Sequence, residues 1–128
     1  MMKVLPDDRR ILGEVMKRLA DSNIVDLIIT TGGTGFSESD VTPEATLDIV
    51  ERQVPGIPEA MRAYSMQFTK RAMLSRAAAG IRKQTLIVNF PGSPKSLKES
   101  LEYILPELIH GVEILQGIAK ECAAPKEA

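Results

Sequence analysis

The residues whose types and spacing could do chemistry lie at positions 30–46, in the string TTGGTGFSESDVTPEAT. Gly32, Gly33 and Gly35 can adopt positive φ and carry no Cβ, so a ligand can approach the backbone N–H groups of such a loop closely. Asp40 follows this loop, and a carboxylate beside backbone donors is suited to holding Mg²⁺ on a phosphate. Together these residues predict a site for a phosphate-bearing ligand.

A simpler interpretation is that the glycines only relieve strain in a tight connection between a strand and a helix. Composition alone gives this interpretation equal weight. The common phosphate-binding fingerprints do not match, because GxxxxGK[ST] requires a Lys after the last Gly and GxGxxG requires a Gly where Ser37 or Glu38 stands. We therefore expect neither a Walker loop nor a dinucleotide-binding loop.

A strand before this loop and a helix after it must position the glycines and the carboxylate. The apolar run at residues 25–29 is typical of a strand that is buried on both faces. Thr42 is predicted to cap the helix, with Pro43 at the first helical position and Glu44 in the first turn, where the helix dipole favours negative charge.

A second strand and loop repeat this pattern further along the chain. Residues 85–90 form another apolar run, Pro91 and Gly92 follow it, and Ser93 is predicted to cap the next helix. Because strands alternate with helices, we predict an α/β fold, a three-layer sandwich with a mostly parallel sheet, and both loops at the carboxyl ends of the strands. Lys95 could add a positive charge there.

Apolar residues at helical spacing predict further amphipathic helices. The first is predicted to be capped by Asp7 or Asp8, the helix from residue 42 continues to Val54, and two helices after Ser93 are separated at Pro106. Another helix, between these, carries a stripe of large side chains that we interpret as a surface for a second subunit, formed by Ile57, Met61, Tyr64 and Phe68.

Composition and charge limit the classes of function. A chain of 128 residues with 44% apolar residues predicts a single domain over residues 1–128, with a frayed tail from about Lys120. A net charge of -1 and 4% aromatic residues argue against nucleic acid as a partner. Without a signal peptide or a long apolar segment, we expect no membrane association and a cytoplasmic location. We assign neither a disulfide nor a metal to the lone Cys122 and the lone His110.

The string at residues 30–46 and a second one at residues 75–94, SRAAAGIRKQTLIVNFPGSP, resemble two signatures of the molybdenum-cofactor biosynthesis family. This family includes molybdopterin adenylyltransferases and the G-domain of gephyrin. The resemblance runs from about Leu5 to Leu115. It implies a molybdopterin-binding fold, a hairpin that turns at Lys83 and Gln84, and a homo-oligomer, commonly a trimer.

The resemblance also implies a function. Members of this family bind ATP with Mg²⁺ and molybdopterin, transfer the adenylyl group to the terminal phosphate of the pterin and release pyrophosphate. The implied metal-binding and catalytic residue is Asp40. A non-catalytic module that binds molybdopterin or nucleotide, or acts as a scaffold, is the alternative, and a nucleotide-cleaving hydrolase is a third possibility. The residues with implied ligand-binding roles are Thr31, Gly32, Gly33, Thr34, Gly35, Thr42, Pro91, Gly92, Ser93 and Lys95.

Two features differ from the usual pattern of the family. Its members usually begin with another strand ending in Ser-Asp, a loop with a second functional Asp and a helix, and this chain starts after these roughly 30 residues. An Arg that commonly precedes the signature Asp is Ser39 here. We therefore expect an unpaired sheet edge and an active site without the second carboxylate.

Overall fold

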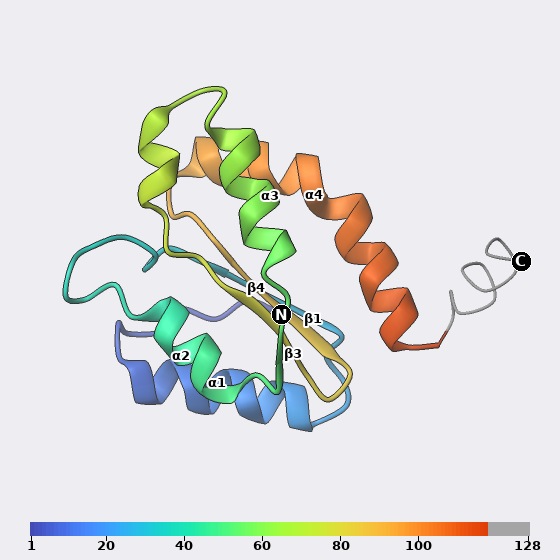
Figure 1. Cartoon of the computed structure of the whole chain (residues 1–128). Coiled ribbons are helices and arrows are strands. Elements are labelled where there is room, and N and C mark those ends of the chain that lie inside the picture. Colours follow the sequence, from blue (N-terminus) through green and yellow to red (C-terminus); the bar gives the residue numbers. More distant parts are fainter. Residues whose placement is uncertain (118–128) are drawn as a thin grey trace, which may run out of the picture.

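Helices cover both faces of a four-stranded sheet in the computed structural model (Figure 1). The structure describes residues 1–117, so the predicted fraying from Lys120 lies outside the described residues. The elements follow the chain in this order: α1 (Arg9–Asp21), β1 (Leu27–Thr31), α2 (Thr42–Ile49), β2 (Arg52–Gln53), α3 (Gly56–Ser65), the 3₁₀ helix η1 (Lys70–Leu74), β3 (Ala79–Arg82), β4 (Thr85–Phe90) and α4 (Pro94–Leu115).

The sheet is mixed, which corrects the prediction of a mostly parallel one. Its strand order is β1-β4-β3-β2, and the only parallel pair among the described strands is β1 with β4. β3 turns directly into β4 at Lys83, whose φ is 53°, and two strands joined by so short a turn must run antiparallel. The predicted hairpin is therefore present, and it is the reason why the sheet is mixed.

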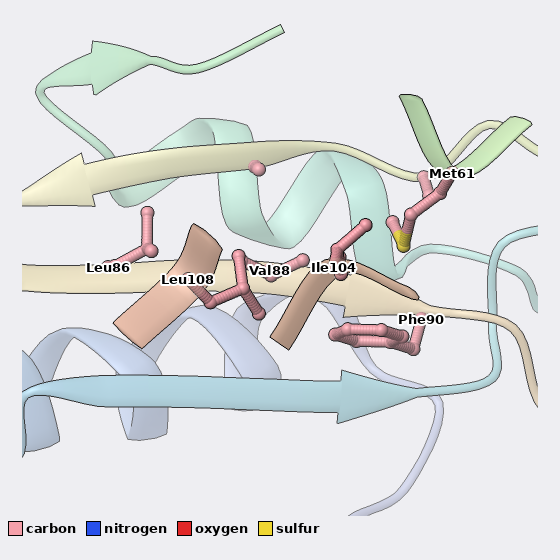
Figure 2. Packing of buried hydrophobic residues seen from close by; sticks show 8 residues of the cluster. Met61, Leu86, Val88, Phe90, Ile104 and Leu108 are labelled. Carbon is pink, nitrogen blue, oxygen red and sulfur yellow. The ribbon is translucent and has the colours of Figure 1, made fainter. Parts of the chain in front are cut away.

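Two apolar clusters fasten the helices to the sheet. On one face, residues of α3 and α4 pack on β4, as Figure 2 shows for Met61, Phe90 and Ile104. On the other face, Met16 of α1 packs with Ile87 of β4. All six residues of β4 are buried, as expected for a strand covered on both faces. The predicted arrangement of helix, sheet and helix layers is therefore observed.

The stripe on α3 belongs largely to the chain's own core. Met61 is buried in the cluster under α4, and Ile57 packs against that cluster. The ring of Tyr64 stacks on Tyr103 of α4, with the ring centroids 4.0 Å apart, and Phe68 contacts Tyr64 edge-on. The stripe thus has partners within the chain and gives no reason to expect a second subunit. Self-association stays a prediction, which rests on the resemblance to the family.

Two predicted helix boundaries are wrong. α4 continues through Pro106, because Ile104 and Leu108 on either side of it are buried in the same cluster and hold the helix against the sheet. α2 ends at Ile49, where the backbone becomes extended and leads into β2, which pairs with β3.

None of the helices in the described part of the chain is long and apolar enough to cross a membrane.

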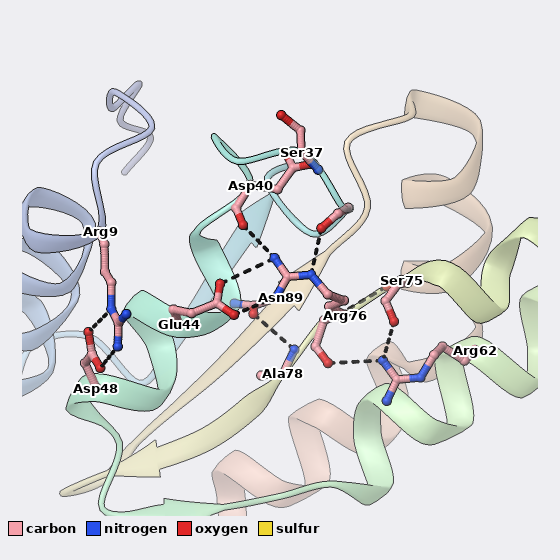
Figure 3. A network of polar contacts seen from close by, with 12 residues as sticks. Arg9, Ser37, Asp40, Glu44, Asp48, Arg62, Ser75, Arg76, Ala78 and Asn89 are labelled. Carbon is pink, nitrogen blue, oxygen red and sulfur yellow. Dashed lines mark hydrogen bonds and ion pairs between the residues drawn. The ribbon is translucent and has the colours of Figure 1, made fainter.

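Asn89 is a buried polar side chain that links several elements. Its Oδ1 accepts a hydrogen bond from the N–H of Ala78 at 3.1 Å, and its Nδ2 donates to the hydroxyls of Thr30 and Thr46 at 3.0 and 2.9 Å. The amide therefore connects β4 with β1, with α2 and with the segment before β3. Figure 3 shows its contact with Ala78. Such a buried group stabilises a fold only when all its partners are present.

We predict that Asn89→Ala lowers the free energy of unfolding by roughly 2–5 kcal/mol, because the Thr46 hydroxyl and the Ala78 N–H both lose a partner. Urea unfolding measures this change. The control Gln84→Ala alters an exposed residue of the hairpin turn and should change stability by less than about 0.5 kcal/mol. Equal stabilities of the two variants would show that the amide network contributes nothing.

Candidate functional site

The two glycine loops meet at one edge of the sheet. β1 and β4 are adjacent and parallel, so the loops that follow them leave the sheet at the same end. The N–H of Gly32 donates to the carbonyl of Phe90 at 3.0 Å. A Cβ built on Gly92 would lie 3.1 Å from the Cα of Gly32, so the loops are in backbone contact. The structure thus brings together the two segments that the sequence singled out.

The first loop requires its glycines for backbone reasons. Gly32 and Gly33 have φ values of 87° and 69°, in the left-handed region that favours glycine. A Cβ on Gly33 would also collide with Oγ1 of Thr42. A Cβ on Gly35 would lie 2.8 Å from Oδ2 of Asp40. Tight packing therefore explains the glycines by itself, and their role in binding a ligand stays a prediction.

The loop leaves a row of backbone donors unused. The N–H of Gly32 is taken by Phe90, but within the described residues the N–H groups of Gly33, Thr34 and Gly35 form no hydrogen bond. Thr34 is buried. Successive free N–H groups in a turn form an anion-binding concavity. The donors available to a phosphate are therefore those of residues 33–35.

Thr42 does not cap α2 as predicted. The helix begins at Thr42 itself, and the residue in the N-cap position is Val41, which makes no side-chain capping bond. Thr42 is buried, and its N–H donates to the carbonyl of Gly33 at 3.2 Å. The threonine therefore fixes the glycine loop against the start of the helix. Ser93 does occupy the N-cap position of α4, but without a capping bond from its side chain.

Arg76 clamps the loop to α2, a role that the sequence analysis missed. Its Nε donates to the carbonyl of Gly35 at 2.7 Å, its Nη2 donates to the carbonyl of Asp40 at 2.6 Å, and its Nη1 donates to Oε2 of Glu44 at 2.5 Å (Figure 3). Its own N–H donates to the carbonyl of Thr34 at 2.8 Å. The signal in the sequence was a single arginine before the small residues AAAG.

Only one oxygen of the Asp40 carboxylate forms a hydrogen bond to the described residues. Oδ2 accepts the N–H of Ser37 at 3.0 Å, whereas Oδ1 forms no hydrogen bond to the described residues. Among residues 1–117 no three His, Cys, Asp or Glu side chains gather into a metal-binding group. Mg²⁺ typically uses one or two carboxylates together with phosphate oxygens. Asp40 therefore fits a metal that a phosphate ligand shares, and not a metal held by protein alone.

Only some of the predicted site residues border a hollow, and they border two different ones. Thr34, Gly35 and Pro91 line a pocket of about 270 Å³, which we call the smaller pocket, and Thr31, Gly32 and Thr42 line a larger groove beside β1. The predicted site residues that line neither are Gly33, Asp40, Gly92, Ser93 and Lys95. The glycine loop therefore separates the two hollows.

The smaller pocket is lined in part by hydroxyl and guanidinium groups that the sequence analysis did not select. Arg62 donates to the carbonyls of Ser75 and Ala77 at 3.1 Å each, so its charge faces no carboxylate there. The side chain of Ser100 is 1% exposed, and its Oγ has no hydrogen-bond partner. The other polar side chains that line the pocket are Ser65, Thr69, Arg71, Ser75 and Ser96. These groups could donate to an anionic or hydroxyl-bearing ligand.

Comparison with known proteins gives matches across most of the chain. Residues 1–110 match the family described as "Probable molybdopterin binding domain". The chain is similar to the molybdopterin adenylyltransferase of Haemophilus influenzae, with 45% identity over 116 residues, which are 91% of this chain and 58% of that protein. Its structure is similar to that of the molybdopterin biosynthesis enzyme MoaB from Thermus thermophilus, with a TM-score of 0.80 and 46% identity, covering 88% of this chain and 70% of that one.

The chain is shorter than these relatives. It is 39% identical to the molybdopterin adenylyltransferase of Helicobacter pylori (strain J99) over 115 residues, which are 90% of this chain and 65% of that protein. It therefore spans about two thirds or less of the adenylyltransferases that it matches. Part of their length has no counterpart here.

The ion pair of the clamp predicts a pH dependence. The hydrogen bond from Arg76 holds the pKa of Glu44 below its ordinary value. The ion pair therefore contributes its full stabilisation at pH values above the pKa of Glu44 in the unfolded chain, about 4.3. This stabilisation is lost as the pH falls through the lower pKa of Glu44 in the folded chain.

We predict that wild type melts at a higher temperature than Glu44→Gln at pH 7, and that this difference disappears in strong acid. Because both partners are about one third exposed, with side-chain exposures of 34% and 36%, the difference at pH 7 should be about 1 kcal/mol or less. Thermal melts across pH measure it. The control Glu107→Gln changes an exposed glutamate of α4. A difference between wild type and Glu44→Gln that stays constant with pH would contradict the ion-pair explanation.

Proposed function

The chain belongs to the family of molybdopterin-binding domains of molybdenum-cofactor biosynthesis, and from this premise we propose that it binds molybdopterin and Mg-ATP and catalyses adenylyl transfer to molybdopterin. The observation that carries the proposal is the row of unused N–H groups at residues 33–35, at the carboxyl end of β1. Relatives with 39–45% identity are named molybdopterin adenylyltransferases, which supports the reaction type.

Adenylyl transfer suits a loop of this kind. An oxygen of the pterin's terminal phosphate forms a bond to the α-phosphorus of ATP, the bond to the β-phosphate oxygen breaks, and pyrophosphate leaves. Such a reaction needs positioned donors and charge neutralisation more than a protein nucleophile. The N–H groups of residues 33–35 would bind phosphate oxygens, and the clamp by Arg76 would keep them in place.

The residues present fit a magnesium ion shared with a phosphate. Oδ1 of Asp40 is the oxygen without a partner, while the N–H of Ser37 fixes the orientation of the carboxylate through Oδ2. When bound, Mg²⁺ would neutralise the charge of the polyphosphate.

The second candidate function is a module that binds molybdopterin or nucleotide without catalysis. It rests on the same free N–H groups of residues 33–35, which would bind a phosphate whether or not transfer follows.

Pyrophosphate release separates the candidate functions. The chain is incubated with ATP, Mg²⁺ and molybdopterin, and pyrophosphate is measured with and without the pterin. An adenylyltransferase releases pyrophosphate only when the pterin is present, whereas a hydrolase releases product from ATP alone. A binding module releases none but retains affinity for the ligands in equilibrium dialysis. The proposal is contradicted if the chain neither releases pyrophosphate nor binds the ligands.

We predict that Asp40→Asn lowers magnesium-dependent ATP binding or turnover by on the order of tenfold to a thousandfold, the loss typical of one preorganised electrostatic group. The Asn Oδ1 can still accept the N–H of Ser37, so the melting temperature should barely change. The control Glu38→Gln removes the same charge from an exposed residue of the same loop and should leave binding unchanged.

A purely structural role for Asp40 gives the opposite pattern. The free energy of unfolding then falls by about 1 kcal/mol, as for a lost capping residue, and the magnesium dependence of binding is unaltered. Measuring the melt and the magnesium titration on the same Asp40→Asn protein distinguishes the two roles.

A further inference from the structure

Residues 75–78 lead from η1 into β3 and pass beside the first glycine loop. One edge of this segment has backbone partners. The N–H of Arg76 donates to the carbonyl of Thr34 at 2.8 Å, and the carbonyl of Ala78 accepts the N–H of Asn89 at 3.0 Å. Because the backbone groups of successive residues in an extended chain point to opposite edges, the carbonyls of Ser75 and Ala77 face the other way.

A side chain of α3 takes the place of a strand along this second edge. β2 pairs with β3 at residues 80 and 81, and the N–H of Val54 donates to the carbonyl of Ala79 at 2.9 Å, but no described strand continues beyond it. Nη1 of Arg62 donates to the next two carbonyls on that edge, those of Ala77 and Ser75, at 3.1 Å each. One guanidinium group therefore holds two alternate carbonyls of the segment.

The two arginines are connected in series. Arg76 lies between the two residues whose carbonyls Arg62 holds, and Figure 3 shows the two guanidinium groups on opposite sides of the segment. Arg76 in turn holds the carbonyls of Thr34, Gly35 and Asp40. A shift of the segment would therefore move the clamp and, with it, the free N–H groups of residues 33–35.

Arg62 stands on an anchored part of α3. The residue before it, Met61, is 4% exposed and packs in the core cluster under α4. Among residues 1–117 Arg62 forms no ion pair, so its hydrogen bonds to the protein are those to the two backbone carbonyls. Bonds from a charged donor are stronger than neutral ones. Arg62 thus fixes the segment relative to the core.

We propose that Arg62 is a positioning residue for the phosphate-binding loop. From α3 it fixes residues 75–78, and through Arg76 it sets the position of the N–H groups of residues 33–35. The assignment rests on the proposed function, because these donors are the ones that would bind the phosphate. Arg62 acts on the phosphate only through Arg76, since it donates to the segment and not to the loop.

Hydrogen exchange of the ligand-free protein tests the positioning directly. The amides of Arg76 and Thr42 donate to carbonyls of the first loop, so their exchange rates report how firmly the loop is held. We expect Arg62→Met to accelerate the exchange of both at least about tenfold, because two bonds from a charged donor are lost. The amide of Leu86, at the far end of β4, should change less.

A matched control separates positioning from the charge of the pocket. Arg71 lines the same smaller pocket and is exposed, and its guanidinium forms no hydrogen bond within the described residues. Arg71→Met removes the same charge and should leave the exchange rates unchanged. Arg62→Lys keeps a charged donor and should restore part of the protection that Arg62→Met loses.

Titration with inorganic pyrophosphate tests the consequence for the donors. The amide signals of residues 33–35 are followed in isotope-labelled protein, at a temperature where every variant is folded. We expect Arg62→Met to weaken binding about tenfold, within the range for one preorganised group. In protein that already carries Arg76→Met, adding Arg62→Met should have a smaller further effect, because the connection is already broken.

Four results would overturn the assignment. In Arg62→Met, the amides of Arg76 and Thr42 exchange no faster than in wild type, or the amide of Leu86 accelerates as much as they do, which indicates only lower global stability. Alternatively, Arg71→Met weakens pyrophosphate binding as much as Arg62→Met, or the effects of Arg62→Met and Arg76→Met are additive. Wild-type protein that binds no pyrophosphate contradicts the proposed function instead, and the exchange rates of the ligand-free protein still decide whether Arg62 positions the loop.

Discussion

The parallel pairing of β1 with β4 determines where both glycine loops lie. It brings Gly32 into backbone contact with Gly92, because parallel strands deliver their carboxyl ends to the same edge of the sheet. The same pairing places β4 in the interior, where its six residues are buried, and no described strand lies on the other side of β1. The arrangement of the candidate site thus follows from one strand pairing.

In the first loop, the carbonyl acceptors have hydrogen-bond partners and the N–H donors of residues 33–35 have none within the described chain. Arg76 satisfies its acceptors, since the carbonyls of Thr34, Gly35 and Asp40 receive N–H groups from that residue. The donors of residues 33–35 receive no such partner within the described chain. A loop with occupied acceptors and free donors presents positive potential without a lysine. An anion could therefore bind there without rearranging the loop, which is the preorganisation that catalysis of phosphoryl-type transfer requires.

Local patterns predicted the elements better than they predicted the contacts between distant residues. The apolar runs identified β1 and β4, and the glycines identified both loops, because these signals depend on neighbours in the sequence. The clamp was missed because Arg76 lies 41 residues from Gly35, and no local pattern indicates that pairing. Thr42 has the ordinary character of a capping residue, but tertiary packing against Gly33 overrode it. Pro106 likewise ended a helix only in the sequence-based prediction, since burial of its neighbours outweighs one lost hydrogen bond.

The groove and the candidate site are physically connected. Thr31, Gly32 and Thr42 line the end of the groove, while Thr34 and Gly35 line the smaller pocket on the other side of the same loop. The backbone of the first glycine loop is therefore common to both hollows, and a change in its conformation would alter both.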